Sequence, residues 1–542
     1  MPNARWLQSY SGVRATIGRG PEVTAEDKTF AFRHAYCYAL SRLQANPASH
    51  ARIVLARDPR PTGIALAIAQ AQGLDSACCD LGVTLELINL GVVTTPIWQH
   101  SVRAFQAHGG VMISASHNPI DDNGWKYATG VESSGVADPA PPGALLSAAE
   151  MGKLIRAANA FTPQRTHDAI SVDTDNDARE LAIAQYVSFV ADAYAAHAPG
   201  ARVVLDPNGG AASGIAGRAF RALGVDPIVV NDDEGALAHE IDVEHARADG
   251  THVLHQLAER VRAERALFGL AYDFDADRGN LTYVDAAGKA QIPSPQAAAA
   301  INTAVALAVH RRAGDTRPAV VVASDATSSR VRRIAAAFGA DVVDVETGEI
   351  HVVTAMQEQE LRGRRAVVGV EGPNGGTIFA GTTCRDGTLV GAGALLAAAD
   401  PELRAIIASA LAPGRAMSPG LAGCIEMLPP QRSFMEKHAA PADWATTVDR
   451  LEREFPRVFA AELAHTWAAF EIIYSYTRYV GPMRPMAAGY GWKARVTRPG
   501  AEGFLWIRKS KTEAGVARII GDGPDEASAR TLLAIGLKLL RE

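Results

Sequence analysis

The chain has 542 residues, of which 48% are hydrophobic and 21% are charged, and its formal net charge is −6. This length exceeds what one hydrophobic core supports, so we expect three or four domains of ordinary globular protein. The mild negative charge, without any basic tract, argues against non-specific binding to nucleic acid. The five cysteines are odd in number and lack CxxC spacing, which argues against a disulfide framework or a zinc knuckle.

The N-terminal residues do not show the pattern of a secretory signal, because no cationic segment is followed by an apolar stretch. The longest apolar run, residues 297–309, is too short to span a bilayer. We therefore expect a cytoplasmic protein, monomeric or homodimeric, that binds neither a membrane nor nucleic acid.

Strand and helix patterns alternate from the beginning of the chain. After a glycine-rich loop at residues 10–20, which carries Arg14, the sequence predicts a βαβαβ unit. Its strands are expected at 52–56, 85–89 and 111–113, and its helices at 24–44, about 63–79 and 97–107. Such a unit is typical of a parallel sheet.

The same pattern returns twice, which indicates internal repetition. The second unit has strands at 202–206, 227–230 and 267–272, with helices from Gly210 and from about His252. The third has strands at 318–323, 341–345 and 366–370, with helices at 328–338 and 352–361. Ligands of open α/β sheets bind beyond the carboxyl ends of the strands, so three such units could build a shared cleft.

The last part of the chain differs, with aromatic and charged residues, strands from Thr466 onward and helices at 444–455 and 525–540. We predict an α/β protein of four domains around a central cleft, with three similar βαβαβ mixed-sheet domains and a C-terminal α+β domain. The expected domains are residues 1–184, 185–311, 312–412 and 413–542.

The serine loop, residues 114–119 (Ser-Ala-Ser-His-Asn-Pro), follows the apolar strand that ends the first unit. A rigid strand beneath an exposed loop tip suits Ser116 as a nucleophile, with His117 as a proton acceptor and Lys126 as a nearby cation. A polar turn after a core strand is the alternative interpretation.

The metal loop, residues 273–278, places Asp273, Asp275 and Asp277 at alternate positions directly after a strand. Alternate side chains share a face, so three carboxylates can converge on one hard cation, most simply Mg²⁺. A calcium-binding EF-hand needs glycine and glutamate where this chain has Arg278 and Val284, so that pattern fails. A solvated acidic turn remains the alternative.

Two further loops contain groups that bind sugars and phosphates. In residues 371–376, Glu371 and Asn374 could hydrogen-bond to paired sugar hydroxyls, although the segment could equally be a plain glycine turn. Residues 508–513 bring together Arg508 and further cations and hydroxyls, as a phosphate monoester requires, but basic loops are common. Asp386, in the segment 385–387, is a candidate helix cap.

These four stretches resemble the motifs of the α-D-phosphohexomutase superfamily, in the family's order and over most of the chain. The resemblance matches the phosphoserine loop, the metal loop, the sugar-binding loop and the phosphate-binding loop with residues 114–119, 273–278, 371–376 and 508–513. Departures are Lys509, Lys511 and Ala514 in the phosphate loop and Pro373 in the sugar loop.

The resemblance also implies roles for individual residues. Ser116 would carry a phosphoryl group, and its oxygen would join Asp273, Asp275 and Asp277 around a single Mg²⁺. The other implied site residues are His117, Lys126, Arg278 and Arg14 for catalysis, and Glu371, Asn374, Gly375, Arg508, Ser510, Lys511 and Thr512 for substrate binding. Glu349 is a further departure: it occupies the candidate acid/base position where many members of the family have a Gly-His pair.

The function implied by the resemblance is interconversion of hexose 6-phosphate and hexose 1-phosphate, where the hexose is mannose, glucose or glucosamine. The reaction would pass through a phosphoserine enzyme and a 1,6-bisphosphate, with Mg²⁺ as cofactor and a glucose 1,6-bisphosphate-type activator. The partner is thus a small-molecule phosphosugar.

Two alternatives are a metal-dependent sugar phosphatase and a catalytically altered protein that only binds phosphosugars. A plain hydrolase needs no second phosphate loop, and a silent protein needs neither the serine nor the three aspartates. A dinucleotide enzyme is disfavoured because GxGxxG opens none of the βαβ units.

Overall fold

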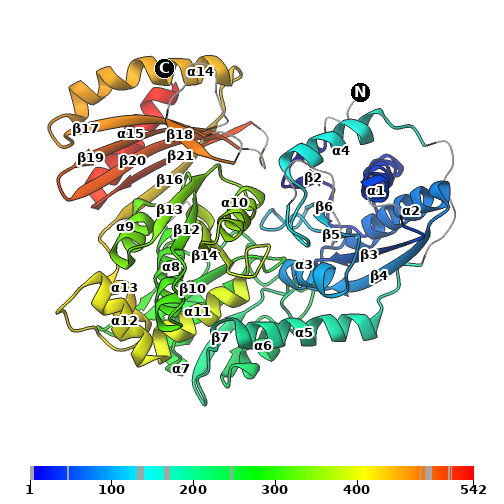
Figure 1. Ribbon diagram of the computed structural model, residues 1–542, viewed down its shortest axis with the longest axis horizontal. Helices are drawn as coiled ribbons and strands as arrows, with labels where there is room; N and C mark the ends of the chain where they lie inside the picture. The colour runs from blue at the N-terminus through cyan, green and yellow to red at the C-terminus, as the bar shows by residue number, and fades with distance from the viewer. Residues whose placement is uncertain are drawn as a thin grey trace. The chain divides into compact units, whose positions relative to one another are not determined.

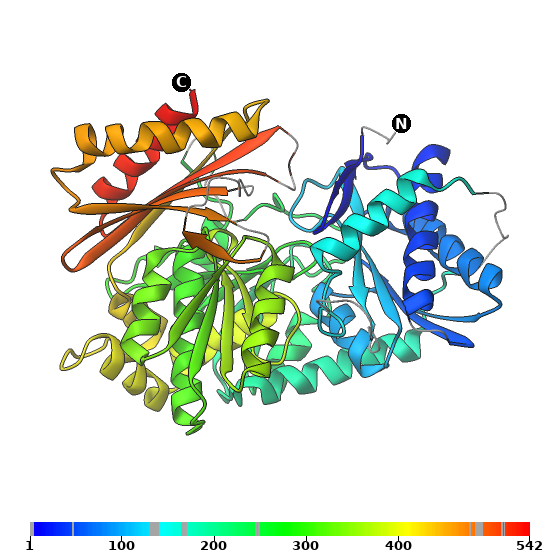
Figure 2. The same cartoon turned by 45° about the horizontal axis from the view of Figure 1, so that its top comes forward.

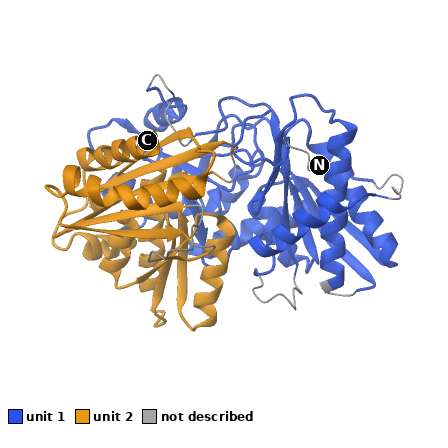
Figure 3. Cartoon of the chain, turned by 90° about the horizontal axis from the view of Figure 1, so that it is seen from above, with its two compact units in different colours: residues 1–294, 376–401, 418–423 blue, residues 295–375, 402–417, 424–542 orange. Residues whose placement is uncertain are grey.

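A central strand with a parallel neighbour on each side occurs three times along the chain (Figure 1). The computed structural model describes residues 5–541 except 46–47, 131–139, 164–170, 244–246, 248–249, 476–477, 483–490, 511–512 and 514. Two compact units contain these elements: unit 1 is residues 1–294, 376–401 and 418–423, and unit 2 is residues 295–375, 402–417 and 424–542 (Figure 3). None of the described helices is both long and apolar enough to cross a membrane.

The first sheet, in unit 1, is centred on β3 (His50–Arg57), which lies between the parallel strands β4 (Thr84–Val92) and β5 (Gly109–Ile113). The antiparallel strand β6 (Asp122–Thr129) follows β5 in the sheet, so the serine loop joins two adjacent strands. The sheet continues through β2 (Gly12–Thr16) to β1 (Leu7–Ser9). Its helices are α1 (Ala25–Ala45), α2 (Gly63–Leu81), α3 (Thr95–Ala104) and α4 (Ala148–Ala160).

The second sheet, also in unit 1, repeats the arrangement. Its central strand β7 (Arg202–Asp206) lies between the parallel strands β8 (Asp226–Val229) and β9 (Gly269–Tyr272). The antiparallel strand β10 (Gly279–Val284) follows β9, so the metal loop also joins adjacent strands, and β11 (Ala290–Gln291) pairs with β10. The other elements of unit 1 are α5 (Asn176–Tyr194), α6 (Ala216–Ala222), α7 (His255–Glu264), β15 (Gly376–Phe379) and α11 (Gly387–Ala399).

Unit 2 begins with the third copy, in which β12 (Ala319–Ser324) lies between the parallel strands β13 (Asp341–Val345) and β14 (Arg365–Glu371). Apolar residues such as Val320, Val321 and Val322 are fully buried along β12, as expected for a strand covered on both faces. The helices of this copy are α8 (Pro295–Arg312), α9 (Ser329–Phe338), α10 (Glu349–Leu361) and the 3₁₀ turn η1 (Gly372–Asn374). The helices α12 (Pro401–Leu411) and α13 (Gly420–Met427) come next.

The C-terminal part of unit 2 is a sheet whose neighbouring strands pair antiparallel, with helices packed against it (Figure 2). Its strand order is β16 (Arg432–Ala439), β21 (Val516–Gly523), β20 (Ala501–Lys509), β19 (Gly491–Arg498), β17 (Ala469–Ser475) and β18 (Val480–Pro482). Buried Trp492, Leu505 and Ile519 form its core with Leu451 of α14 (Trp444–Val458) and Leu539 of α15 (Glu526–Arg541). A π-helical turn, η2 (Phe459–Leu463), continues α14.

The predicted fold class is confirmed: the protein is α/β with three similar mixed sheets and a C-terminal α+β part. The prediction of a loop at residues 10–20 is wrong, because Gly12–Thr16 forms β2 and pairs with both β1 and β6. The side chains of Val13 and Ala15 are buried there, and Arg14 between them is buried too, which obscures the polar–apolar alternation of an ordinary edge strand. The four domain bounds stay a prediction.

Candidate active site

Ser116 lies in the loop between β5 and β6, with a left-handed backbone at φ = 54°. Its amide donates to the Ser114 hydroxyl at 2.8 Å, which holds this uncommon conformation in a non-glycine residue. We expected Ser116 at an exposed tip, but its side chain is completely buried. The reason is the metal loop: the Ser116 hydroxyl donates to Asp273 Oδ2 at 3.1 Å, across 157 residues of sequence.

The metal loop brings its three aspartates together as the sequence predicted. One oxygen from each of Asp273, Asp275 and Asp277 lies within 4.8 Å of the others, and all three residues are buried. Among the described residues, neither Asp275 Oδ1 nor Asp277 Oδ1 has a hydrogen-bond partner, although both atoms are buried. Buried carboxylate oxygens without partners are costly, so this donor set fits a hard divalent cation such as Mg²⁺.

The pKa values of the aspartates respond to this crowding. Burial, and then the charges of Asp277 and Asp275, raise the pKa of Asp273 well above its usual range. Burial alone would also raise the pKa of Asp277, but Arg385, Lys126 and Arg278 outweigh it and hold that pKa below the usual range. The cluster thus combines repelling acids with a surrounding layer of cations.

Lys126 is the closest of the predicted cations, with Nζ at 2.7 Å from Asp275 Oδ2 and 3.5 Å from Asp277 Oδ2. Arg278 Nε lies 3.6 Å from Asp277 Oδ1, and the Arg278 amide donates to Asp273 Oδ1 at 3.1 Å. The structure therefore brings both predicted cations to the serine and the aspartates.

Arg14 is also at this site, and burial lowers its pKa to about 10, partly offset by the nearby Asp275. Its Nε and Nη1 are buried and have no hydrogen-bond partner among the described residues, which suits an anionic ligand. His117 follows Ser116 directly and is partly buried.

Three residues of this site were not identified from the sequence. Arg385 Nη2 donates to Asp277 Oδ2 at 2.6 Å, from a segment more than a hundred residues away in sequence. Thr95, the first residue of α3, donates from its amide to the Asp275 carbonyl and from its hydroxyl to Asp275 Oδ2, each at 2.9 Å. The positive end of the α3 dipole thus faces the acidic loop. The expectation that Asp386 caps a helix is confirmed, because it accepts from Leu389 at the start of α11.

Arg60 is the third site residue that was not identified from the sequence, and it binds the backbone of the serine loop. Its side chain is fully buried, forms an ion pair with Asp58 at 3.1 Å and lies over the Phe274 ring of the metal loop. Its guanidinium donates to three backbone carbonyls of the serine loop, those of Ser116, Asn118 and Pro119, and to that of Asp122 at the start of β6. A lone arginine in a Pro-rich segment carries no sequence signal for such a role.

A second cluster of predicted residues lies within unit 2, where β13 and β14 end. Glu371 Oε1 accepts from the Gly348 amide at 2.8 Å, so the sugar loop meets the loop that precedes α10. Arg508, at the end of β20, donates to Glu346 Oε1 and to the Thr347 carbonyl, both at 3.0 Å. The structure therefore joins Glu371 and Arg508 through one loop, residues 346–348.

The structure describes most of the other predicted residues of unit 2, but not all of them. Glu349 is buried at the first turn of α10, next to this loop. Asn374 ends η1 and Gly375 follows it with a left-handed backbone at φ = 66°, which explains the glycine. The Ser510 hydroxyl accepts from the Glu513 amide at 3.1 Å. Lys511 and Thr512 lie outside the described residues.

Comparison with known families gives two matches along the chain. The model described as phosphoglucomutase/phosphomannomutase, alpha/beta/alpha domain I, matches residues 7–136, and the corresponding model of domain III matches residues 300–411. The first match contains Ser116 and Lys126, and the second contains Glu349 and Glu371.

Curated relatives include phosphoglucosamine mutases. That of Lactobacillus johnsonii is 32% identical over 232 residues, which is 42% of this chain and 46% of the relative. That of Clostridium perfringens is 33% identical over 281 residues, or 50% of this chain and 54% of the relative. The chain thus spans about half the length of the curated relatives that it matches.

Solved structures share the fold over nearly the whole chain. A phosphoglucomutase/phosphomannomutase family protein from Burkholderia thailandensis has a TM-score of 0.65 at 20% identity, covering 99% of this chain and 96% of the other. A structure described as a putative phosphomannomutase, from Thermus thermophilus, has a TM-score of 0.63 at 18% identity, covering 99% and 100%.

Proposed function

Because this chain belongs to the α-D-phosphohexomutase superfamily, we propose that it interconverts a hexose 6-phosphate and a hexose 1-phosphate. The observation that supports this most strongly is the hydrogen bond of 3.1 Å from Ser116 to Asp273, inside a cluster of three buried acids. A serine oxygen in contact with a candidate metal site is suited to hold and release a phosphoryl group.

In the proposed reaction, phosphorylated Ser116 gives its phosphoryl group to the free hydroxyl of a monophosphorylated hexose. The resulting 1,6-bisphosphate turns over, and its other phosphate returns to Ser116. Asp273, Asp275 and Asp277 would hold Mg²⁺, which neutralises charge on a transferring phosphoryl group when bound. Arg14 and Lys126 supply further positive charge, which stabilises the developing charge in the transition state.

Proton transfer requires a group beside the reacting hydroxyls. We assign His117 to the serine side, because it is adjacent to Ser116 in the loop, and Glu349 to the sugar side, because it is a buried carboxylate next to the loop that contacts Glu371. These assignments remain part of the proposal.

Unit 2 would hold the sugar and its second phosphate. Glu371, Asn374 and Gly375 would contact the sugar, and Arg508 with Ser510, Lys511 and Thr512 would contact the phosphate that is not reacting. Arg508 presents a planar fork of donors, which matches phosphate geometry. Among hexoses, the similarity to phosphoglucosamine mutases makes glucosamine phosphate the first substrate to test.

The decisive experiment combines a turnover assay with detection of the phosphoenzyme. Purified protein receives Mg²⁺, a trace of glucose 1,6-bisphosphate, and the 6-phosphate of glucosamine, glucose or mannose in turn. We expect a 1-phosphate product from at least one sugar and a mass increase of one phosphoryl group on the Ser116 peptide. Release of inorganic phosphate in place of an isomer would identify a phosphatase, and tight binding without turnover would identify a phosphosugar-binding protein.

A further inference from the structure

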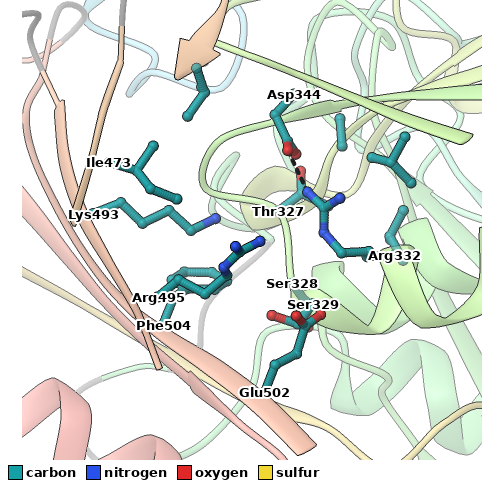
Figure 4. A pocket seen from close by; sticks show the side chains of 14 residues that line it. Thr327, Ser328, Ser329, Arg332, Asp344, Ile473, Lys493, Arg495, Glu502 and Phe504 are labelled. Atoms are coloured by element: carbon teal, nitrogen blue, oxygen red, sulfur yellow. Dashed lines mark hydrogen bonds and ion pairs between the residues drawn. The ribbon is translucent and has the colours of Figure 1, made fainter. Parts of the chain in front are cut away.

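A cavity within unit 2 lies between the third sheet and the C-terminal sheet, and none of the described residues assigned above to substrate binding lines it. It has a volume of about 40 Å³, and Figure 4 shows the side chains that line it. One wall comes from α9 and its N-terminal loop and includes Thr327 and Arg332, and the other comes from β19 and β20 and includes Lys493 and Arg495. Arg508 is not among the lining residues.

Three cationic side chains enter this cavity from its two walls. Figure 4 shows Lys493 and Arg495 reaching in from the strands and Arg332 from the helix. Of the described lining residues, two carry carboxylates, Asp344 and Glu502, so the lining has one more positive than negative group. Asp344 is already bonded to Arg332.

In the described part of the chain, the N–H donors of these cationic side chains have hydrogen-bond partners for only some of their hydrogens. Lys493 Nζ donates to the Asp325 carbonyl at 2.8 Å and lies 3.9 Å from the centre of the Phe504 ring, and the charges of Asp344, Asp325 and Asp522 also act on it. Arg495 pairs with the half-exposed Glu471, but its Nε has no hydrogen-bond partner among the described residues. Burial lowers the pKa of Lys493, and the charges of Asp344 and Asp325 offset part of this effect.

We propose that this cavity binds a small tetrahedral oxyanion, inorganic phosphate, at a site separate from the substrate loops. An anion between Lys493, Arg495 and Arg332 offsets their mutual repulsion and accepts their remaining N–H groups. The cavity has room for about three water-sized spheres, which suits an ion of the size of phosphate.

The position of the cavity also connects it with the sugar loop. Thr327, which lines it, accepts from the Gly372 amide at 3.1 Å and donates to the Val370 carbonyl at 3.3 Å. A bound ion therefore contacts the wall that supports the loop of residues 371–376. Occupancy of the cavity would accordingly stabilise unit 2 around this loop.

The test measures binding without turnover, so it does not depend on the proposed mutase reaction. The metal-free full chain carrying Arg508→Gln is titrated with inorganic phosphate at constant ionic strength, and its melting temperature is followed. The Arg508→Gln background removes the phosphate contact assigned to the substrate loop. We expect a saturable rise in melting temperature with phosphate and none with an equivalent addition of chloride.

Adding Arg495→Gln to this background should weaken the apparent phosphate affinity about tenfold, the equivalent of one charge-assisted hydrogen bond. Arg495 is partly exposed, so this variant should fold, and Lys493→Met provides a second substitution at a half-buried position. Arg530→Gln is the matched control, because Arg530 is an exposed arginine that also pairs with an exposed glutamate, Glu526. The proposal is overturned if the Arg508→Gln protein does not respond to phosphate, or if Arg495→Gln responds as strongly as the control.

Discussion

Buried charges are paired differently in two regions of the molecule. One region is the serine and metal loops of unit 1, and the other is Arg508 of unit 2 with its acceptors Glu346 and Thr347. In unit 1, Asp275 and Asp277 each keep a buried oxygen without a hydrogen-bond partner among the described residues. In unit 2, Arg508 already donates to Glu346 and to the Thr347 carbonyl. The first region therefore has carboxylate oxygens that can bind a cation. In the second region, Arg508 must give up its hydrogen bonds to Glu346 and Thr347 before it can bind the phosphate of a substrate.

The largest expected effect comes from Ser116→Ala, which removes the oxygen that would carry the phosphoryl group. Mutase activity should fall by at least about a thousandfold, as expected when a covalent step is lost. A coupled assay of 1-phosphate formation measures this, and circular dichroism checks that the variant folds. Ser49→Ala, an exposed serine of the same unit, is the control and should retain full activity. Near-normal turnover by Ser116→Ala would rule out the phosphoenzyme.

Arg508→Gln should have the next largest effect, and mainly on KM. Losing one charge-assisted fork to a phosphate should raise KM about 10–100-fold while kcat changes little, because this phosphate is not the reacting one. Arg453→Gln, an exposed arginine of α14, is the control for general charge loss. A drop in kcat with unchanged KM would place Arg508 at the reacting group instead.

Asp273→Asn should stabilise the protein in the absence of metal. The folded-state pKa of Asp273 is raised by burial and by its acidic neighbours, so the stability it contributes is present at low pH and is lost as pH rises through that pKa. At pH 7 a neutral amide avoids this loss, so the free energy of unfolding should increase. Denaturant unfolding in EDTA measures it.

The same variant should lose most of the stabilisation that wild-type protein gains from Mg²⁺, because a carboxylate ligand is missing. Asp233→Asn, at an exposed loop position of unit 1, should change neither quantity. If Asp273→Asn destabilised the metal-free protein, the three acids would not be repelling each other as the structure indicates.

Glu346→Gln should have the smallest effect, a decrease of KM by about threefold. The substitution weakens the competitor that phosphate must displace from Arg508, while the amide oxygen can still accept one hydrogen bond. Steady-state kinetics with the 6-phosphate substrate measures the change, and Glu402→Gln on α12 is the exposed control. An increase in KM would mean that Glu346 positions Arg508 for the phosphate and does not compete with it.

Much of the fold could be predicted because the repeated units carry strong local patterns. Strands such as 202–206 and 319–324 are short apolar runs with helical segments between them, and the parallel order follows from that alternation. Among the strands that escaped prediction, β6 and β10 each pair antiparallel with the strand that precedes them in sequence, and β2 pairs with β1 and with the distant β6. Arg14 in β2 and Lys126 in β6 are buried at the site, so the usual pattern of a half-buried strand is broken there.

The residues of the site also fall into those that the sequence predicts and those that it does not. Asp273, Asp275 and Asp277 could be identified because one short loop contains the whole donor set. Arg385 and Thr95 could not, because each reaches the loop through tertiary structure and neither stands in a motif. The burial of Ser116 was likewise unpredictable, since it depends on a segment 157 residues away.

The hydrogen bonds of Arg60 restrict which sequence changes the protein can tolerate in and after the serine loop. A single guanidinium spans the carbonyls of Ser116, Asn118, Pro119 and Asp122 and also lies over Phe274. Side chains along the serine loop can be exchanged without disturbing these bonds, whereas a residue inserted or deleted between Ser116 and Asp122 shifts several carbonyls out of register at once. Besides the side chains of Ser114 and Ser116, the length of this loop is therefore a property that selection must preserve.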